Sequence, residues 1–167
     1  NVWFARDAAT VRNSTAILAD PIADVRASFT YTNDDETAIA DGKLPANSSD
    51  TSIPRWTSWP RLGAEQQIDI TLKKRMSIKS IGIYWYDDNK GVKLPVKWRV
   101  EEEQGDNKYY EIVVNEYGTK GDCFNKACTK TLTDTDKLRI YVTPQKDAAV
   151  GILEILIEEE EEGKYAE

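Results

Sequence analysis

Short segments in which apolar and polar residues alternate recur along this chain, and they constrain its fold more than any other feature. The clearest segments span residues 66–72 and 137–143, where Ile, Leu and Val alternate with polar side chains. A period of two places every apolar side chain on one face of a β-strand. We therefore predict sheets that have one face in a core and the other face solvated or shared.

About eight strand-like segments are bounded by residues typical of turns, which favours an all-β sandwich or barrel. The predicted strands are 27–32, 66–72, 78–86, 97–103, 109–114, 127–133, 137–143 and 150–158. With 167 residues the chain suits one domain with a sizeable core. We predict a lead-in at residues 1–24, a sandwich at 25–158 and an acidic tail or linker at 159–167. Pro21 is expected to end any local structure that the lead-in forms.

The composition excludes several classes of function. The formal net charge is −7 and the basic residues are scattered, so nucleic acid is not expected as a partner. Histidine is absent, which removes the usual general base, and the Ser and Cys residues lack a visible base, so we expect no catalysis. No stretch approaches the ~20 apolar residues that span a bilayer, so no membrane partner is expected.

A single glutamate, Glu154, interrupts the apolar run at residues 150–157. On either face of a strand it would have apolar neighbours, and a buried, unpaired carboxylate would cost several kcal/mol. It must therefore be protonated, hydrogen-bonded or close to a cation. One interpretation is a calcium site built from Asp41, Ser49 and loop oxygens and closed by Glu154, because calcium prefers oxygen ligands. In the alternative, Asp41 forms an ordinary turn with Gly42, and Glu154 pairs with an arginine such as Arg99 or Arg139.

The stretch from residue 33 to 63 exceeds the usual length of a connection, which favours a functional or ion-bound loop. It carries Trp56 and Trp59 between two prolines. Aromatic rings suit the apolar faces of sugars, while charged side chains bind the hydroxyls. We predict a sugar site with Trp56 or Trp59 as the stacking surface, whereas Trp85 is predicted to be core. The surrounding predicted ligand-binding residues are Arg55, Tyr86, Asp87, Asp88 and Lys93.

Two further patterns have alternative interpretations. Asp87 and Asp88 could be a pair of catalytic carboxylates, but their Asp-Asp-Asn-Lys-Gly context is ordinary turn chemistry, which we favour. Cys123 and Cys128 are the only thiols, with no second pair to complete a zinc site. We favour a disulfide that closes a small loop over two free thiols.

Three segments together resemble a known family: AIADGKLPANSSDTSIPRWTSWP, QIDITLKKRMSIKSIGIYWYDDNKGVKLPVKWRV and AAVGILEILI. They resemble the accessory module of β-L-arabinofuranosidase-type and related bacterial glycoside hydrolases. That module resembles the galactose-binding-like fold, also called the coagulation factor type C or discoidin-like fold. The resemblance spans about residues 27–157. It implies an antiparallel jelly-roll β-sandwich, a structural calcium held by Asp41, Glu154 and neighbouring loop oxygens, and sugar binding by loops at one end.

These observations predict a non-catalytic carbohydrate-binding module of an extracellular or periplasmic polysaccharide-degrading enzyme. Its expected partners are a polysaccharide or oligosaccharide and the parent catalytic domain. Two alternatives are a structural sandwich that packs on a catalytic domain without binding sugar, and a protein-recognition or adhesion domain. An exposed aromatic residue on the 33–63 loop would favour sugar, whereas a broad apolar patch would favour packing.

Overall fold

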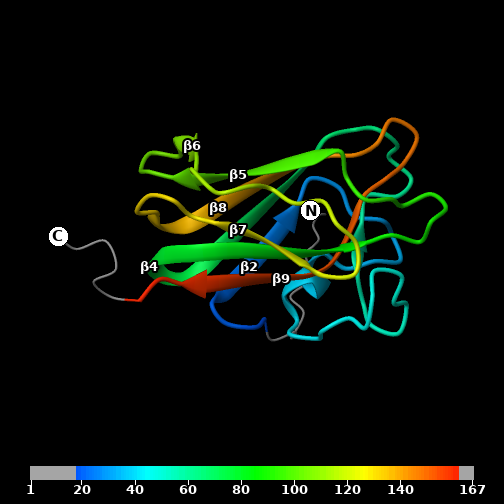
Figure 1. Cartoon of the computed structure of the whole chain (residues 1–167), viewed down its shortest axis with the longest axis horizontal. Helices are drawn as coiled ribbons and strands as arrows, with labels where there is room; N and C mark the ends of the chain where they lie inside the picture. The colour runs from blue at the N-terminus through cyan, green and yellow to red at the C-terminus, as the bar shows by residue number, and fades with distance from the viewer. Residues whose placement is uncertain (1–17, 162–167) are drawn as a thin grey trace, which may run out of the picture.

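The computed structural model describes residues 18–161 and consists almost entirely of β-strands (Figure 1). All pairs of named strands are antiparallel, which confirms the predicted all-β antiparallel sandwich. The elements of the described region are β2 (Ile22–Ala27), the 3-10 helix η1 (Glu36–Ala40), β3 (Trp56–Thr57), β4 (Gln66–Tyr86), β5 (Lys97–Glu103), β6 (Tyr109–Glu111), β7 (Phe124–Cys128), β8 (Asp134–Thr143) and β9 (Gly151–Glu159).

The long strand β4 belongs to both layers of the sandwich. Its first half pairs with β2 and β8, and β8 continues to β5 and β6. Its second half pairs with β7 and β9, and β9 continues to β3. Two separate strands were predicted here, but the chain bends at the exposed residues 73–75 without leaving the strand, and the register with β8 shifts there.

The core lies between the two layers. The apolar residues of the alternating segments 66–72 and 137–143 are all buried, as predicted. Trp85 is also buried as predicted, with its ring centroid 5.7 Å from that of Trp98 in an edge-to-face contact. Both indole N–H groups donate to the carbonyl of Gly118, so neither ring leaves a polar atom unpaired.

Two predicted boundaries of the sandwich were misplaced. β2 begins at Ile22, inside the predicted lead-in, and most of the predicted strand 27–32 is a loop. Pro21 does not end the ordered structure, because its carbonyl accepts a hydrogen bond from Lys73 N at the bend of β4. At the other end β9 includes Glu159, and Glu160 N donates to Ser77 O. The remaining parts of the lead-in and tail, 1–17 and 162–167, lie outside the described residues.

The predicted disulfide is wrong, because Cys123 and Cys128 are free thiols. Residues 124–128 form the extended strand β7 rather than a loop. Five residues of extended chain separate the two Cα atoms by roughly 16 Å. A disulfide requires a Cα separation below about 7 Å.

The longer loops, after β2, after β4 and after β8, gather at one end of the sandwich. In Figure 1 this is the right-hand end, opposite β6. The residues after β2, around β3 and after β4 are therefore brought together. Among residues 18–161 there is no helix with the length and apolar character needed to cross a membrane.

Candidate functional site

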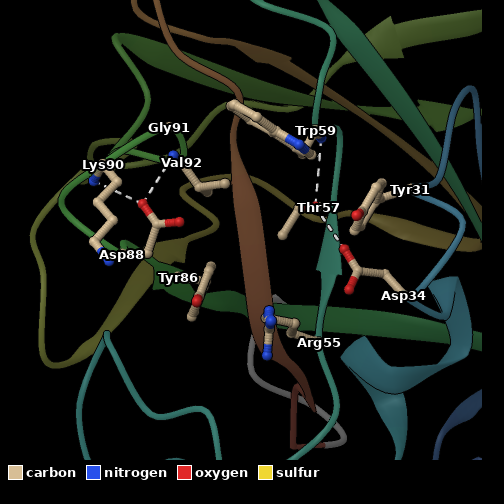
Figure 2. Close-up of a pocket in the computed structure, with 10 residues that line it drawn as sticks. All are labelled: Tyr31, Asp34, Arg55, Thr57, Trp59, Tyr86, Asp88, Lys90, Gly91 and Val92. Atoms are coloured by element: carbon tan, nitrogen blue, oxygen red, sulfur yellow. Dashed lines mark hydrogen bonds between the residues drawn. The ribbon is translucent and has the colours of Figure 1, made fainter.

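A pocket of about 280 Å³ opens among these loops (Figure 2). Its walls come from the loop after β2, from the segment around β3 and from the turn after β4. Figure 2 shows Trp59 at one end and Arg55 at the other. The lining residues are Tyr31, Asp34, Arg55, Thr57, Trp59, Tyr86, Asp88, Lys90, Gly91 and Val92.

Trp59 supplies the exposed aromatic ring of the pocket, with 36% of its surface accessible. Its indole lies against the backbone of Gly91. A Cβ atom at residue 91 would lie 2.1 to 2.8 Å from three atoms of the ring, closer than van der Waals contact allows. Only glycine at residue 91 leaves room for the ring in this position, so the Trp59 ring packs on the turn after β4.

Trp56 is not a stacking surface, which corrects one of the two predicted platforms. It is fully buried, pairs with Ile152 of β9, and its indole N–H donates to Phe29 O at 2.9 Å. The apolar core therefore surrounds a ring that was expected in a loop. The short strand β3 explains the difference, because pairing with β9 turns this ring into the sandwich while Trp59 lies beyond the end of the strand.

Two carboxylates line opposite sides of the pocket, and the protein holds both in place (Figure 2). Asp34 Oδ2 accepts the hydroxyl of Thr57 at 2.5 Å, and burial raises the pKa of Asp34 above its ordinary value. Asp88 Oδ1 accepts hydrogen bonds from the backbone N–H groups of Lys90 at 2.7 Å and Val92 at 3.0 Å. Among residues 18–161 the hydrogen bonds to these two carboxylates thus go to Asp34 Oδ2 and Asp88 Oδ1.

The pocket also carries two cationic side chains, Arg55 and Lys90. The guanidinium carbon of Arg55 lies 4.7 Å from the centre of the Tyr86 ring. Tyr86 is buried, and this burial raises the pKa of its phenol. Cations and carboxylates thus face a common space beside an aromatic ring, a combination suited to a polar ligand with an apolar face.

The structure brings Arg55, Trp59, Tyr86 and Asp88 together in the pocket. It leaves three predicted residues outside the lining, namely Trp56, Asp87 and Lys93. The Asp87 carboxylate accepts Asn89 N at 2.6 Å, as the turn interpretation of this pair implied. The backbone of Lys93 is held by the Ala149 carbonyl. Sequence reasoning missed six lining residues: Tyr31, Asp34, Thr57, Lys90, Gly91 and Val92. The available signals were position alone, since Asp34 and Thr57 lie in the long 33–63 segment and Lys90 and Gly91 lie in the turn after Asp88.

Glu154 is fully buried, as its apolar neighbours suggested. Its Oε2 atom accepts a hydrogen bond from Gly42 N at 2.9 Å, whereas its Oε1 atom is buried with no hydrogen-bond partner among the described residues. Burial raises the pKa of Glu154 to about 9, and the nearby Asp41 carboxylate also raises it. The side chain is therefore held as a neutral acid unless a cation is close.

Among residues 18–161 Glu154 forms no ion pair with an arginine, so the predicted pairing with Arg99 or Arg139 is wrong. Arg139 pairs with Asp69 at 2.9 Å, and Arg99 lies near Glu65 and Glu101. Both arginines belong to the outer face of the other layer, so neither reaches the covered carboxylate.

The carboxylates of Asp41 and Glu154 lie near each other at the end of η1. Asp41 ends η1, and its Oδ1 accepts Lys43 N at 2.9 Å. Ser49 is exposed, and its hydroxyl donates to Asn47 Oδ1 at 3.0 Å within its own turn. Within residues 18–161 no three or more Asp, Glu or Cys side chains are grouped so that they could hold a metal ion. A cation here would need backbone carbonyls and hydroxyls beside the two carboxylates, and calcium accepts such ligands.

Comparison with solved structures identifies the fold. The family 32 carbohydrate-binding module of Clostridium perfringens NanJ, solved with galactose, matches with a TM-score of 0.62 and 13% identity, covering 80% of this chain and 91% of that one. The fold is that of family 32 carbohydrate-binding modules. A chain of the Streptococcus pneumoniae β-galactosidase BgaA matches with a TM-score of 0.65 and 13% identity, covering 85% and 93%.

A chitosan-binding module of a Paenibacillus sp. IK-5 chitosanase/glucanase matches with a TM-score of 0.61 and 14% identity, covering 84% of this chain and 96% of that one. No protein-family model and no curated protein matches the sequence. The likeness is therefore one of structure. The narrower resemblance to modules of β-L-arabinofuranosidase-type enzymes stays a prediction.

Proposed function

We propose that this chain is a non-catalytic carbohydrate-binding module and that its sugar site is the pocket around Trp59. The observation that carries the proposal is the exposed Trp59 ring, fixed on Gly91 beside charged side chains. A pyranose ring has an apolar face that can stack on the indole, while its hydroxyls can bond to Asp34, Asp88 and Arg55.

The pocket is preorganised, which supports binding of a small polar ligand. The backbone N–H groups of residues 90 and 92 fix Asp88, and the hydroxyl of Thr57 fixes Asp34. Because these groups are already ordered, little side-chain entropy is lost when a sugar binds. The same arrangement offers neither a histidine nor an activated nucleophile, so binding without catalysis is the function that we infer.

Affinity electrophoresis against a panel of soluble polysaccharides, followed by calorimetry with the best ligand, tests the function. Trp59→Ala should weaken binding by about tenfold or more, because it removes the stacking surface. Tyr110→Ala is the matched control, since Tyr110 is an exposed aromatic on β6 at the other end of the sandwich. Absence of binding across arabinans, galactans, xylans, chitosan and host glycans would reject sugar binding and favour a structural packing module or a protein-recognition domain.

The proposal includes a structural calcium held by Asp41, Glu154 and loop oxygens near Ser49. The unpartnered Oε1 of Glu154 and the proximity of the two carboxylates support it, because a divalent cation would neutralise both. Such an ion would join the start of the 41–59 loop to the last strand. Elemental analysis of protein purified in calcium should find about one calcium per chain, and protein without retained calcium would contradict this part of the proposal.

We further propose that the module acts outside the cytoplasm, in the extracellular space or periplasm, attached to a polysaccharide-degrading enzyme. This context rests on the likeness to modules of such enzymes. In that setting the module would keep a catalytic domain close to its substrate and raise the effective concentration of cleavable bonds.

A further inference from the structure

The charged groups of the Trp59 pocket differ in how far the protein already uses them. Asp34 and Asp88 accept hydrogen bonds from Thr57 and from two backbone N–H groups. Within the described part of the chain, the side chains of Arg55 and Lys90 donate no hydrogen bond and form no ion pair. The cationic side chains of the pocket therefore keep more of their hydrogen-bonding capacity for a ligand than the carboxylates do.

Arg55 is the better placed of the two cations. Its guanidinium stacks at 4.7 Å on the buried Tyr86 ring, which limits its freedom and leaves its planar N–H edge to the pocket. A guanidinium binds a carboxylate through two parallel hydrogen bonds, and its pre-formed plane loses little entropy in doing so. Lys90 adds a second positive charge on the other side of Tyr86 in the view of Figure 2.

The position of Arg55 also suits the shape of an acidic sugar. Trp59 and Arg55 lie at opposite ends of the pocket (Figure 2). In a uronic acid the carboxylate projects from one end of the pyranose ring. A sugar that stacks its ring on Trp59 can therefore direct its carboxylate towards Arg55, while the carboxylates of Asp34 and Asp88 accept its hydroxyls.

Resting on the sugar-binding function proposed above, we infer that the preferred ligand is a sugar with a carboxylate, such as a uronic acid residue, and that Arg55 selects it. The charged groups that line the pocket are two cations and two carboxylates, and Arg55 is the cation placed to pair with a ligand carboxylate. The selection comes from direct pairing with Arg55 and should weaken as salt screens the charges.

Calorimetry with matched sugar pairs tests the inference: galacturonate against galactose, and glucuronate against glucose, at low and high salt. At least one uronate should bind about tenfold more tightly than its neutral partner, since a hydrogen-bonded charge pair adds on that order of affinity. Arg55→Gln should remove this preference, because it should lower the affinity for the uronate by about tenfold more than the affinity for its neutral partner. Arg61→Gln is the control, because Arg61 also stacks on an aromatic ring, Phe29, but does not line the pocket.

The outcomes separate the inference from the function beneath it. Neutral sugars that bind as tightly as their uronates, with a Trp59-dependent affinity, would overturn the acidic-sugar inference and leave the carbohydrate-binding function standing. Tighter binding of the cationic sugar galactosamine would overturn it in the same way. If no sugar binds, both proposals fail. Equal loss of uronate preference in Arg55→Gln and Arg61→Gln would also overturn the inference, because it would point to overall charge rather than to the pocket.

Discussion

The outward faces of the two layers of this sandwich differ in whether their charged side chains are solvated and paired or buried. The face formed by β2, the first half of β4, β8 and β5 is solvated. There Arg139 pairs with Asp69 and stacks at 3.9 Å on Tyr109, and Arg99 stacks at 4.1 Å on Tyr141. The outward face of the other layer is covered by the 41–59 loop. There Glu154 lies opposite Tyr84 and is buried, and no basic side chain of residues 18–161 pairs with it.

The difference shows where function is placed in this fold. On the solvated face Asp69 pairs with Arg139, which lies directly opposite it on the adjacent strand β8, and this is ordinary cross-strand pairing. On the covered face a long loop replaces solvent. Gly42 bonds to Glu154, and Ser48 O accepts Asp87 N, which links the loop to the turn that carries Asp88. The loop that covers Glu154 thus also contributes residues to the wall of the candidate sugar site.

The largest expected effect separates the two tryptophans of this loop. Trp56→Ala should lower the free energy of unfolding by about 3–5 kcal/mol, because it empties a fully buried site. Trp59→Ala should cost less than about 1 kcal/mol, because the ring is partly exposed. Urea unfolding of both variants measures this. Equal losses of stability in the two variants would contradict the assignment of Trp56 to the core and Trp59 to the pocket.

The next effect concerns the covered carboxylate and pH. In chelator, the pKa of Glu154 is about 9 when folded and near its ordinary 4.5 when unfolded. Between these values the folded chain keeps a proton that the unfolded chain has lost, so stability should fall as pH rises from about 4.5 to about 9. Glu154→Gln should remove this fall, because the amide stays neutral. The melting temperature measured across this pH range, in chelator, gives the slope of each protein.

Calcium should reverse the order of the same two proteins. At a hundredfold excess over its dissociation constant, calcium would stabilise the wild type by about 2.7 kcal/mol. Glu154→Gln should gain little, because it lacks the charged ligand. Near pH 8 the variant should therefore be more stable than the wild type in chelator and less stable in calcium. Identical melting curves with and without calcium would retire the ion and leave Glu154 as a neutral buried acid.

A smaller effect tests the packing of the Trp59 ring on Gly91. Gly91→Ala should displace Trp59, since the new Cβ would overlap three atoms of its ring. Sugar affinity should fall by about tenfold although residue 91 offers no side chain to the ligand. The control is Gly82→Ala, at a glycine of β4 whose Cβ would make only ordinary contacts, at 3.5 Å or more. Calorimetry compares the affinities, and unchanged binding in Gly91→Ala would contradict the assigned role of this turn.

The smallest effect lies on the solvated face. Asp69→Asn breaks the pair with Arg139, whose side chain is 26% exposed, against 39% for Asp69. The loss should be about 1 kcal/mol or less and should shrink at high salt, because exposed pairs are screened. Urea unfolding at two salt concentrations measures it. A loss as large as that from removing calcium would erase the contrast between the two faces.

The sequence predicted the sheet and its core well, because alternation reports burial directly. The residues at 66–72 and 137–143 needed no tertiary information to be assigned to a core face. The ends of strands were less predictable. β2 starts five residues before the predicted strand because its partner, β4, extends past Leu72 into the bend, and only tertiary pairing sets that limit.

The candidate site was predicted only in part, for a related reason. Trp59, Arg55, Tyr86 and Asp88 were recognisable from their chemistry and their nearness to turns. Trp56 has the same chemistry and lies three residues from Trp59, but pairing with β9 takes it into the core. Tyr31 and Lys90 reach the pocket through the way the loops fold over the sandwich, which no local pattern encodes.

The central claim is that a sugar binds on Trp59, and the indole N–H signals in an NMR titration test it most directly. Trp56, Trp85 and Trp98 are buried with their indole N–H groups bonded to backbone carbonyls, whereas Trp59 is exposed in the pocket. With the best ligand from the polysaccharide panel, the Trp59 signal should shift in a saturable way while the three buried signals stay in place. A saturable titration that leaves the Trp59 signal unmoved would contradict the account, because the sugar would then bind elsewhere on the molecule.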